Sequence, residues 1–158
     1  MKRNDQDCPG VIARPPRLYL AFLVVGLALS YFWPAPPLPG AGTDRYAIGA
    51  GLIAAGALVM AVAMRQFRRA GTNVETHKPT TALVTDGLFG FSRNPIYVSL
   101  TLIYASVGVA LNSAWILGLL IPLLAVMRYR VIAREEQYLE RKFGDQYWQY
   151  RTSVRRWV

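Results

Sequence analysis

The sequence predicts an all-α integral membrane protein with about four transmembrane helices, the last two of which form a C-terminal helical hairpin. Apolar residues make up 53% of its 158 residues, yet the formal net charge is +9. A soluble domain this short could not bury so much apolar surface. In addition, apolar spans alternate with basic segments along the chain, which is typical of proteins that cross a membrane several times.

The first half of the chain is predicted to hold a polar lead and two transmembrane helices. Residues 1–17 are polar and basic, and we expect them to form a basic, mostly disordered lead. Within residues 18–70, apolar spans at 18–33 and about 46–64 are separated by a loop containing prolines, which cannot continue a helix. The second span is rich in glycine and alanine, which let helices approach closely in lipid. We therefore expect its small-residue face to pack inside the bundle.

The second half, residues 71–158, is predicted to form a helical hairpin with a polar extension. The third span begins with Pro95, a residue favoured at the first position of a helix. The expected parts, in chain order, are a span over 95–111, a tight turn at 112–113, a span over about 115–130, a polar helix over 131–143 and an aromatic, basic tail.

The distribution of lysine and arginine predicts the orientation of these spans. There are four such residues before the first span, one in the loop after it, five between the second and third spans, none in the hairpin turn and eight from Arg128 onward. Cytoplasmic segments of membrane proteins carry the excess of basic residues. We therefore expect both termini, the long loop over 65–93 and the C-terminal tail to lie on the cytoplasmic side.

Two polar segments lie at the expected cytoplasmic ends of the hairpin helices, over 77–97 and 134–150. The hairpin brings them together although they are far apart in the chain. The helix that begins at Pro95 points its N-terminus at the same place, where free N–H groups and the helix dipole favour an anionic group. These segments therefore predict a ligand site at the cytoplasmic end of the hairpin.

Each candidate residue in these segments has a structural and a functional interpretation. Glu135 and Glu136 form either a solvated helix start or the place where one carboxylate faces a cationic ligand, since adjacent helical residues point about 100° apart. Arg93 is either an interfacial anchor or a site residue, and Tyr97 either an interfacial anchor or part of a pocket. The only histidine, His77, is better explained as a loop residue than as a base.

The remaining local signals are structural. Asn94 has the residue type of an N-cap for the helix at Pro95, Gly87 suits a turn with positive φ, and Gly144 suits the end of the polar helix. The single cysteine, Cys8, excludes an intrachain disulfide, and no metal-ligand spacing is present. The basic residues bracket apolar spans without forming an aromatic-interleaved stripe, so we expect no nucleic-acid partner.

Two motifs give the chain a family resemblance. The first is Thr81-Ala-Leu-Val-Thr-Asp-Gly-Leu-Phe followed by Ser92-Arg-Asn-Pro-Ile-Tyr97, and the second is Glu135-Glu136, Leu139 and Phe-Gly-Asp-Gln-Tyr-Trp-Gln-Tyr over 143–150. Together they resemble the isoprenylcysteine carboxyl methyltransferase family and its phospholipid methyltransferase relatives. The resemblance covers about residues 72–158, and the first two spans match only in general character.

The resemblance implies a membrane methyltransferase that binds S-adenosyl-L-methionine at the cytoplasmic membrane face. It implies Arg93 and Glu135 as catalytic residues. The cofactor-binding residues that it implies are Thr81, Ala82, Leu83, Val84, Phe89, Asn94, Pro95, Ile96, Tyr97 and Glu135. A carboxylate beside a sulfonium or an α-ammonium group is a favourable charge pairing.

The chain departs from the family pattern at two positions. Asn94 replaces the usual histidine, which excludes proton transfer at that position, and the same Arg-Asn-Pro form is found in bacterial-type members. Val131 stands where the eukaryotic enzymes carry an arginine on the substrate side. Arg130 and Arg134 flank that place and are our candidate substrate-binding residues.

These observations lead to one expected function and two alternatives. We expect carboxyl O-methylation of a lipid-like or small amphipathic acceptor, with membrane lipids as partners, no evident protein partner, no metal, and a location in the bacterial inner membrane. Methylation of an amine, as in phospholipid N-methylation, is the first alternative, and a thiol acceptor stays open. The second alternative is a non-catalytic membrane relative that binds or packs against lipid.

Overall fold

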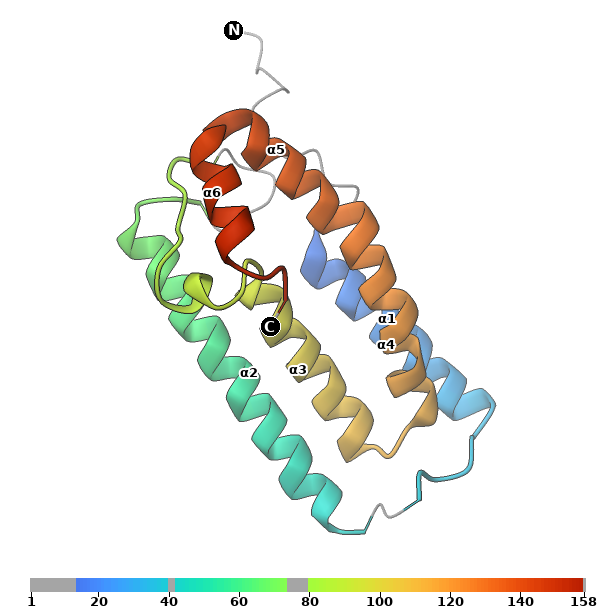
Figure 1. Cartoon of the computed structure of the whole chain (residues 1–158). Helices are drawn as coiled ribbons and strands as arrows, with labels where there is room; N and C mark the ends of the chain where they lie inside the picture. The colour runs from blue at the N-terminus through green and yellow to red at the C-terminus, as the bar shows by residue number, and fades with distance from the viewer. Residues whose placement is uncertain (1–13, 40–41, 74–79, 158) are drawn as a thin grey trace, which may run out of the picture.

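The computed structural model describes residues 14–39, 42–73 and 80–157 of the chain, and in these ranges it is all helical, with no strand (Figure 1). Two helices in the first half, α1 (Pro15–Phe32) and α2 (Asp44–Arg69), are long and apolar enough to cross a membrane. A third such helix covers 114–143, and α3 (Pro95–Ala110) is a shorter apolar helix. The predicted fold class, with about four transmembrane helices, is confirmed.

The third long helix consists of three consecutive segments. An apolar α4 (Ala114–Val126) passes through Pro122 and leads into the π-helical segment η3 (Met127–Ile132), which is followed by the polar α5 (Ala133–Phe143). The hairpin turn before it is tight, because Asn112 adopts a φ of 50° and the Ser113 hydroxyl accepts a hydrogen bond from the backbone N–H of Ile116 at 3.2 Å. The predicted hairpin therefore has a capped second arm.

Two helices extend beyond the predicted bounds. α2 continues to Arg69, where its basic last turn suits the negative end of the helix dipole. The C-terminal tail, predicted only as aromatic and basic, forms a further helix after Gly144, α6 (Asp145–Ser153). Gly144 reverses the chain with a φ of 52°, as predicted for the end of α5. The two tyrosines of α6, Tyr147 and Tyr150, are buried in an apolar cluster with α2 and the loop that follows it.

The bundle has α3 at its centre, with α2 against one side and the pair α1 and α4 against the other (Figure 1). Gly49, Gly56 and Ala63 follow one another at seven-residue spacing and are the buried positions of α2. A Cβ atom on Gly56 would lie 2.8 Å from Ile103 Cγ1 and 3.0 Å from the Ser99 carbonyl oxygen, so the helices meet almost backbone to backbone.

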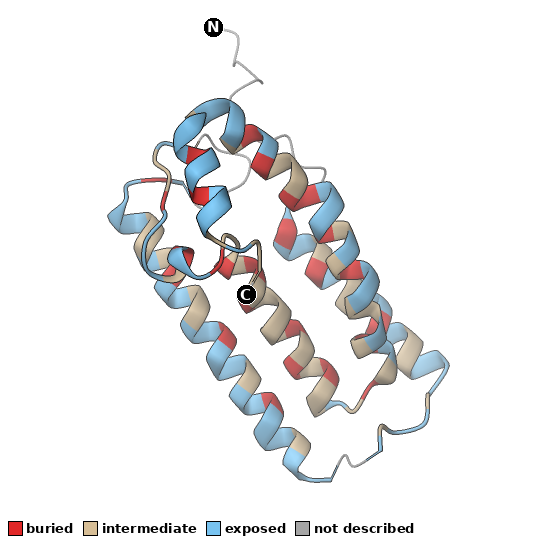
Figure 2. Ribbon diagram, in the orientation of Figure 1, coloured by how far each residue is buried: buried red, intermediate tan, exposed pale blue. Residues whose placement is uncertain are grey.

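The expectation that the whole small-residue face of α2 packs inside is wrong. Gly51, Ala54 and Ala55 are exposed, because one row of small residues is enough for contact with a single neighbouring helix. Large apolar side chains such as Leu58 and Ile121 are also exposed, and Figure 2 shows exposed positions along the length of the helices. This outward apolar surface suits lipid, which solvates it as well as a protein core would.

Candidate functional site

The polar segments of the protein gather at one end of the bundle, around a cavity of about 620 Å³. Its walls come from the start of α1, the last turns of α2, the loop before α3, the start of α3, and α5 and α6. The short 3-10 turn η2 (Gly87–Gly90) completes one wall through Phe89. Cavities of this size hold small molecules and cofactors.

The structure brings most of the predicted site residues together on the walls of this cavity. Thr81, Arg130 and Arg134 do not line it. Thr81 is exposed and its hydroxyl donates to the Gly71 carbonyl at 3.0 Å, which ties it to the end of α2. The predicted residues that do line the cavity are Ala82, Leu83, Val84, Phe89, Arg93, Asn94, Pro95, Ile96, Tyr97 and Glu135.

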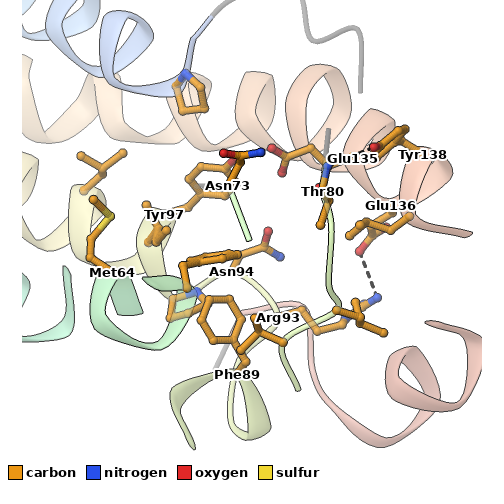
Figure 3. Close-up of a pocket in the computed structure, with 18 of the residues that line it drawn as sticks. Met64, Asn73, Thr80, Phe89, Arg93, Asn94, Tyr97, Glu135, Glu136 and Tyr138 are labelled. Atoms are coloured by element: carbon orange, nitrogen blue, oxygen red, sulfur yellow. Dashed lines mark hydrogen bonds and ion pairs between the residues drawn. The ribbon is translucent and has the colours of Figure 1, made fainter. Parts of the chain in front are cut away.

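Glu135 faces the cavity together with Tyr97 (Figure 3). The buried Tyr97 hydroxyl donates to Glu135 Oε1 at 2.6 Å, which fixes both side chains across the gap between α3 and α5. Within the described part of the chain, no lysine or arginine forms an ion pair with Glu135. A carboxylate held by a neutral hydroxyl is a ready partner for a cation in the cavity.

The adjacent Glu136 has a different environment, since it is buried and paired with two arginines. Arg93 Nη1 lies 3.1 Å from Glu136 Oε1, and Arg156 donates through Nε at 2.9 Å and Nη2 at 2.5 Å. The interpretation of this pair as a solvated helix start is therefore wrong for Glu136. Hydrogen bonding to Glu136 raises the pKa of Arg156, so the Arg156 guanidinium stays charged.

Part of the cavity lining is apolar. Met60 and Met64 of α2 and Leu100 of α3 belong to this lining, and Figure 3 shows Met64 at the end opposite Glu136. The start of α1 lines the cavity with Pro15, Pro16 and the cationic Arg14 and Arg17, although α1 packs mainly on α4 and α2 mainly on α3. The cavity therefore combines ionisable side chains with flexible apolar ones, two of which are thioethers.

The start of α3 differs from the prediction. Asn94 does not cap the helix with its side chain, because its Nδ2 donates instead to the Arg156 carbonyl oxygen at 2.9 Å. The backbone N–H of Tyr97 is not free either, since it donates to the Asn94 carbonyl at 3.0 Å. Gly87 does adopt the predicted positive φ, at 57°. His77 lies outside the described residues.

Sequence reasoning missed several residues of the cavity wall. Met60 and Met64 look like ordinary residues of a transmembrane span. Tyr147 and Tyr150 belong to the second motif, but neither was predicted as a site residue. Both line the cavity, and the Tyr150 hydroxyl donates to the Phe89 carbonyl at 2.7 Å. Burial raises the pKa of both tyrosines, so their hydroxyls remain protonated donors well above neutral pH.

An all-helical membrane bundle with a ligand-sized cavity at its polar end is a membrane protein with an internal binding site. Residues 44–146 match the model of the phospholipid methyltransferase family. A protein of Haemophilus influenzae, itself described as uncharacterized, is 46% identical over 65 residues, which are 40% of this chain and 100% of that relative. The chain belongs to the phospholipid methyltransferase family, and so to the membrane methyltransferases, which confirms the family resemblance of its motifs.

Proposed function

We propose that this protein transfers a methyl group from S-adenosyl-L-methionine to a lipid-like or small amphipathic acceptor. The observation that carries the proposal is Glu135, a carboxylate that faces the cavity, accepts from the Tyr97 hydroxyl at 2.6 Å and has no cationic partner among the described residues. Family membership supports the reaction class.

The residues of the cavity fit this cofactor in charge and in size. S-adenosyl-L-methionine carries a sulfonium and an α-ammonium group, and Glu135 supplies a negative charge for one of them. Phe89 and Leu83 offer an apolar wall for a flat ring system, and the cavity of about 620 Å³ has room for the cofactor and part of an acceptor. When bound, this cofactor supplies an electrophilic methyl group.

The chain's own residues align the reactants and keep water away. Tyr97 holds Glu135 in one orientation, and Glu136 holds Arg93 on the opposite wall. The apolar end at Met60 and Met64 receives the hydrocarbon part of the acceptor, so that its polar head points at the charged end. Alignment in a site that excludes water accounts for a large part of the acceleration in such transfers.

The two candidate acceptors differ in their need for a base. A carboxylate acceptor already carries its nucleophilic electron pair and needs no proton removed, so the arginine-paired Glu136 and the cation-binding Glu135 leave that reaction unhindered. An amine acceptor releases a proton, for which Glu135 is the available carboxylate of the cavity. Because a carboxylate acceptor leaves Glu135 free to pair with the cofactor's cation, we propose a carboxyl group of the isoprenylcysteine type as the acceptor, with a phospholipid-type amine as the second candidate.

We further propose that the cavity opens on the cytoplasmic side of a bacterial inner membrane. The alternation of basic segments supports this orientation. Arg130 and Arg134 do not line the cavity, and their substrate-binding role stays a prediction.

Two measurements on the detergent-solubilised protein test the function. Calorimetry with S-adenosylhomocysteine is expected to show binding at one site. Incubation with methyl-labelled cofactor is expected to label an isoprenylcysteine analogue, and labelling of phosphatidylethanolamine instead would favour the amine reaction. Absence of any S-adenosylhomocysteine binding would overturn the cofactor assignment and leave a non-catalytic membrane relative.

A further inference from the structure

The last described residues, Val154–Trp157, leave α6 and cross to the start of α3 (Figure 1). We call this segment the C-terminal strap. It lies beyond the region that matches the family model, which ends at residue 146. Trp157 packs against the apolar cluster that contains Tyr97, so the strap is anchored at its end.

The strap touches three residues of the cavity wall. The Arg155 carbonyl accepts from the Arg93 backbone N–H at 2.9 Å, and the Arg156 carbonyl accepts from Asn94 Nδ2 at 2.9 Å. The Arg156 guanidinium donates hydrogen bonds to both carboxylate oxygens of Glu136, at 2.9 and 2.5 Å. Arg156 itself does not line the cavity, so any effect on a ligand acts through its neighbours.

These contacts determine how Arg93 and Glu136 are oriented. Glu136 is buried and shared between two arginines, one from the start of α3 and one from the strap. Without Arg156, a buried carboxylate would keep a single cationic partner and would draw Arg93 toward both of its oxygens. The Arg93 backbone N–H and the Asn94 side-chain amide, at the entry of α3 beside the cavity, would lose their two strap carbonyls only if the strap itself detached.

We propose that Arg156 is a positioning residue for the cofactor site, because it holds Glu136, and through Glu136 Arg93, in the orientation that the ligand meets. This inference rests on the proposed function. It assigns the strap as part of the binding apparatus rather than as a loose end of the chain.

The test compares S-adenosylhomocysteine binding by the wild-type protein, Arg156→Ala and Arg151→Ala. Arg151 is the matched control, because it pairs with Glu140 at 3.2 Å on the outside of the same C-terminal region, with both side chains more than two-fifths exposed. We expect Arg156→Ala to weaken binding at least about tenfold, since truncating one partner of a buried charge cluster leaves the other charge poorly compensated. Arg151→Ala should bind like the wild type.

A double-variant cycle separates positioning from a general loss of structure. If Arg156 acts through Glu136, then Arg156→Ala should change binding little in a Glu136→Gln background. Equal losses from Arg156→Ala in both backgrounds would overturn the proposal, as would wild-type affinity in Arg156→Ala. Arg156→Lys keeps the positive charge and one donor to Glu136, so its affinity should lie between those of Arg156→Ala and the wild type. The same variant replaces Arg156→Ala in the comparison if Arg156→Ala does not fold. Absence of binding by the wild-type protein would instead refute the proposed function.

Discussion

The two ends of α3 meet their neighbours in opposite ways. At the C-terminal end, a Cβ on Gly49 would lie 3.1 Å from Ala110 Cβ, and one on Gly108 would lie 2.6 Å from Leu117 Cδ2, so α2, α3 and α4 leave no room between them. At the N-terminal end, Tyr97 and Asn94 border a cavity of about 620 Å³. One helix therefore joins a tightly packed region to a hollow one.

The difference teaches how a small membrane protein makes space for a ligand. Along α2, the positions that approach α3 or the cavity change from Gly49 and Gly56 to Met60, Met64 and Phe67. Small residues allow the backbones to touch, and larger residues hold them apart. Segments outside the bundle, such as α5 and α6, then close the space with polar and aromatic side chains.

The largest expected effect is at the hollow end, on replacing Glu135 by glutamine. This variant keeps the shape of the side chain but removes its negative charge, so affinity for S-adenosylhomocysteine should fall about a hundredfold, the scale of a charge-assisted interaction in a partly buried site. Calorimetry measures this directly. Glu140→Gln, on the exposed side of the same helix, is the control and should bind normally; equal affinities for Glu135→Gln and wild type would remove the basis of the cofactor site.

The packed end should respond to Gly56→Leu in stability. The added side chain would collide with Ile103 and the Ser99 carbonyl, and such overpacking costs about 2 kcal/mol of unfolding free energy. Thermal unfolding in detergent measures the loss. Gly51→Leu, on the exposed side of α2 with no atom within 4 Å of an added Cβ, should be neutral or slightly stabilising. A destabilised Gly51→Leu would show that the outer face is not free.

Tyr97→Phe is expected to have a smaller effect, again on binding. Loss of the hydrogen bond to Glu135 leaves the carboxylate in place but less well oriented, so affinity for S-adenosylhomocysteine should fall about fivefold, in line with about 1 kcal/mol for one hydrogen bond. The exposed Tyr129 provides a control, since Tyr129→Phe should leave affinity unchanged. An unchanged affinity in Tyr97→Phe would mean that this contact does not orient Glu135.

The smallest effect concerns pH. Burial raises the pKa of Tyr150 above its ordinary value of 10.0, so above about pH 10 the unfolded chain loses a proton that the folded chain keeps. The Tyr150 contribution to stability is therefore complete below pH 10 and is lost as the pH rises further. Unfolding midpoints measured from pH 9 to 11 should fall less steeply in Tyr150→Phe than in the wild type. Parallel curves would show that Tyr150 ionises alike in both states.

Much of the fold could be predicted because its signals are local. Pro95 begins α3, Ser113 caps the second arm of the hairpin, and Gly144 ends α5, each through a property of its own residue type. The start of α6 at Asp145 escaped prediction because its buried side chains are tyrosines. Their burial depends on contacts with Ala63, Val84 and Phe89 in distant segments.

The sequence motifs predicted which residues belong to the candidate site, but not which role each residue has. Residue type alone could not decide between Glu135 and Glu136, because both arginine partners of Glu136 are distant in sequence, Arg93 on the start of α3 and Arg156 twenty residues further along the chain. The contacts of the C-terminal strap run partly through the carbonyls of Arg155 and Arg156, which every residue type possesses. Contacts made by backbone carbonyls cannot be predicted from residue type.

The π-helical segment η3 has a consequence for the sign of the charge that reaches the cavity. A π turn takes up about one residue more than an α-helical turn, which shifts every later residue by roughly 100° around the helix axis. Had these residues wound as an uninterrupted α-helix, the angular place of Glu135 beside Tyr97 would fall to Arg134. The wider turn thus decides whether an incoming cation meets the Glu135 carboxylate, hydrogen-bonded by Tyr97, or a guanidinium, without any change of side chains.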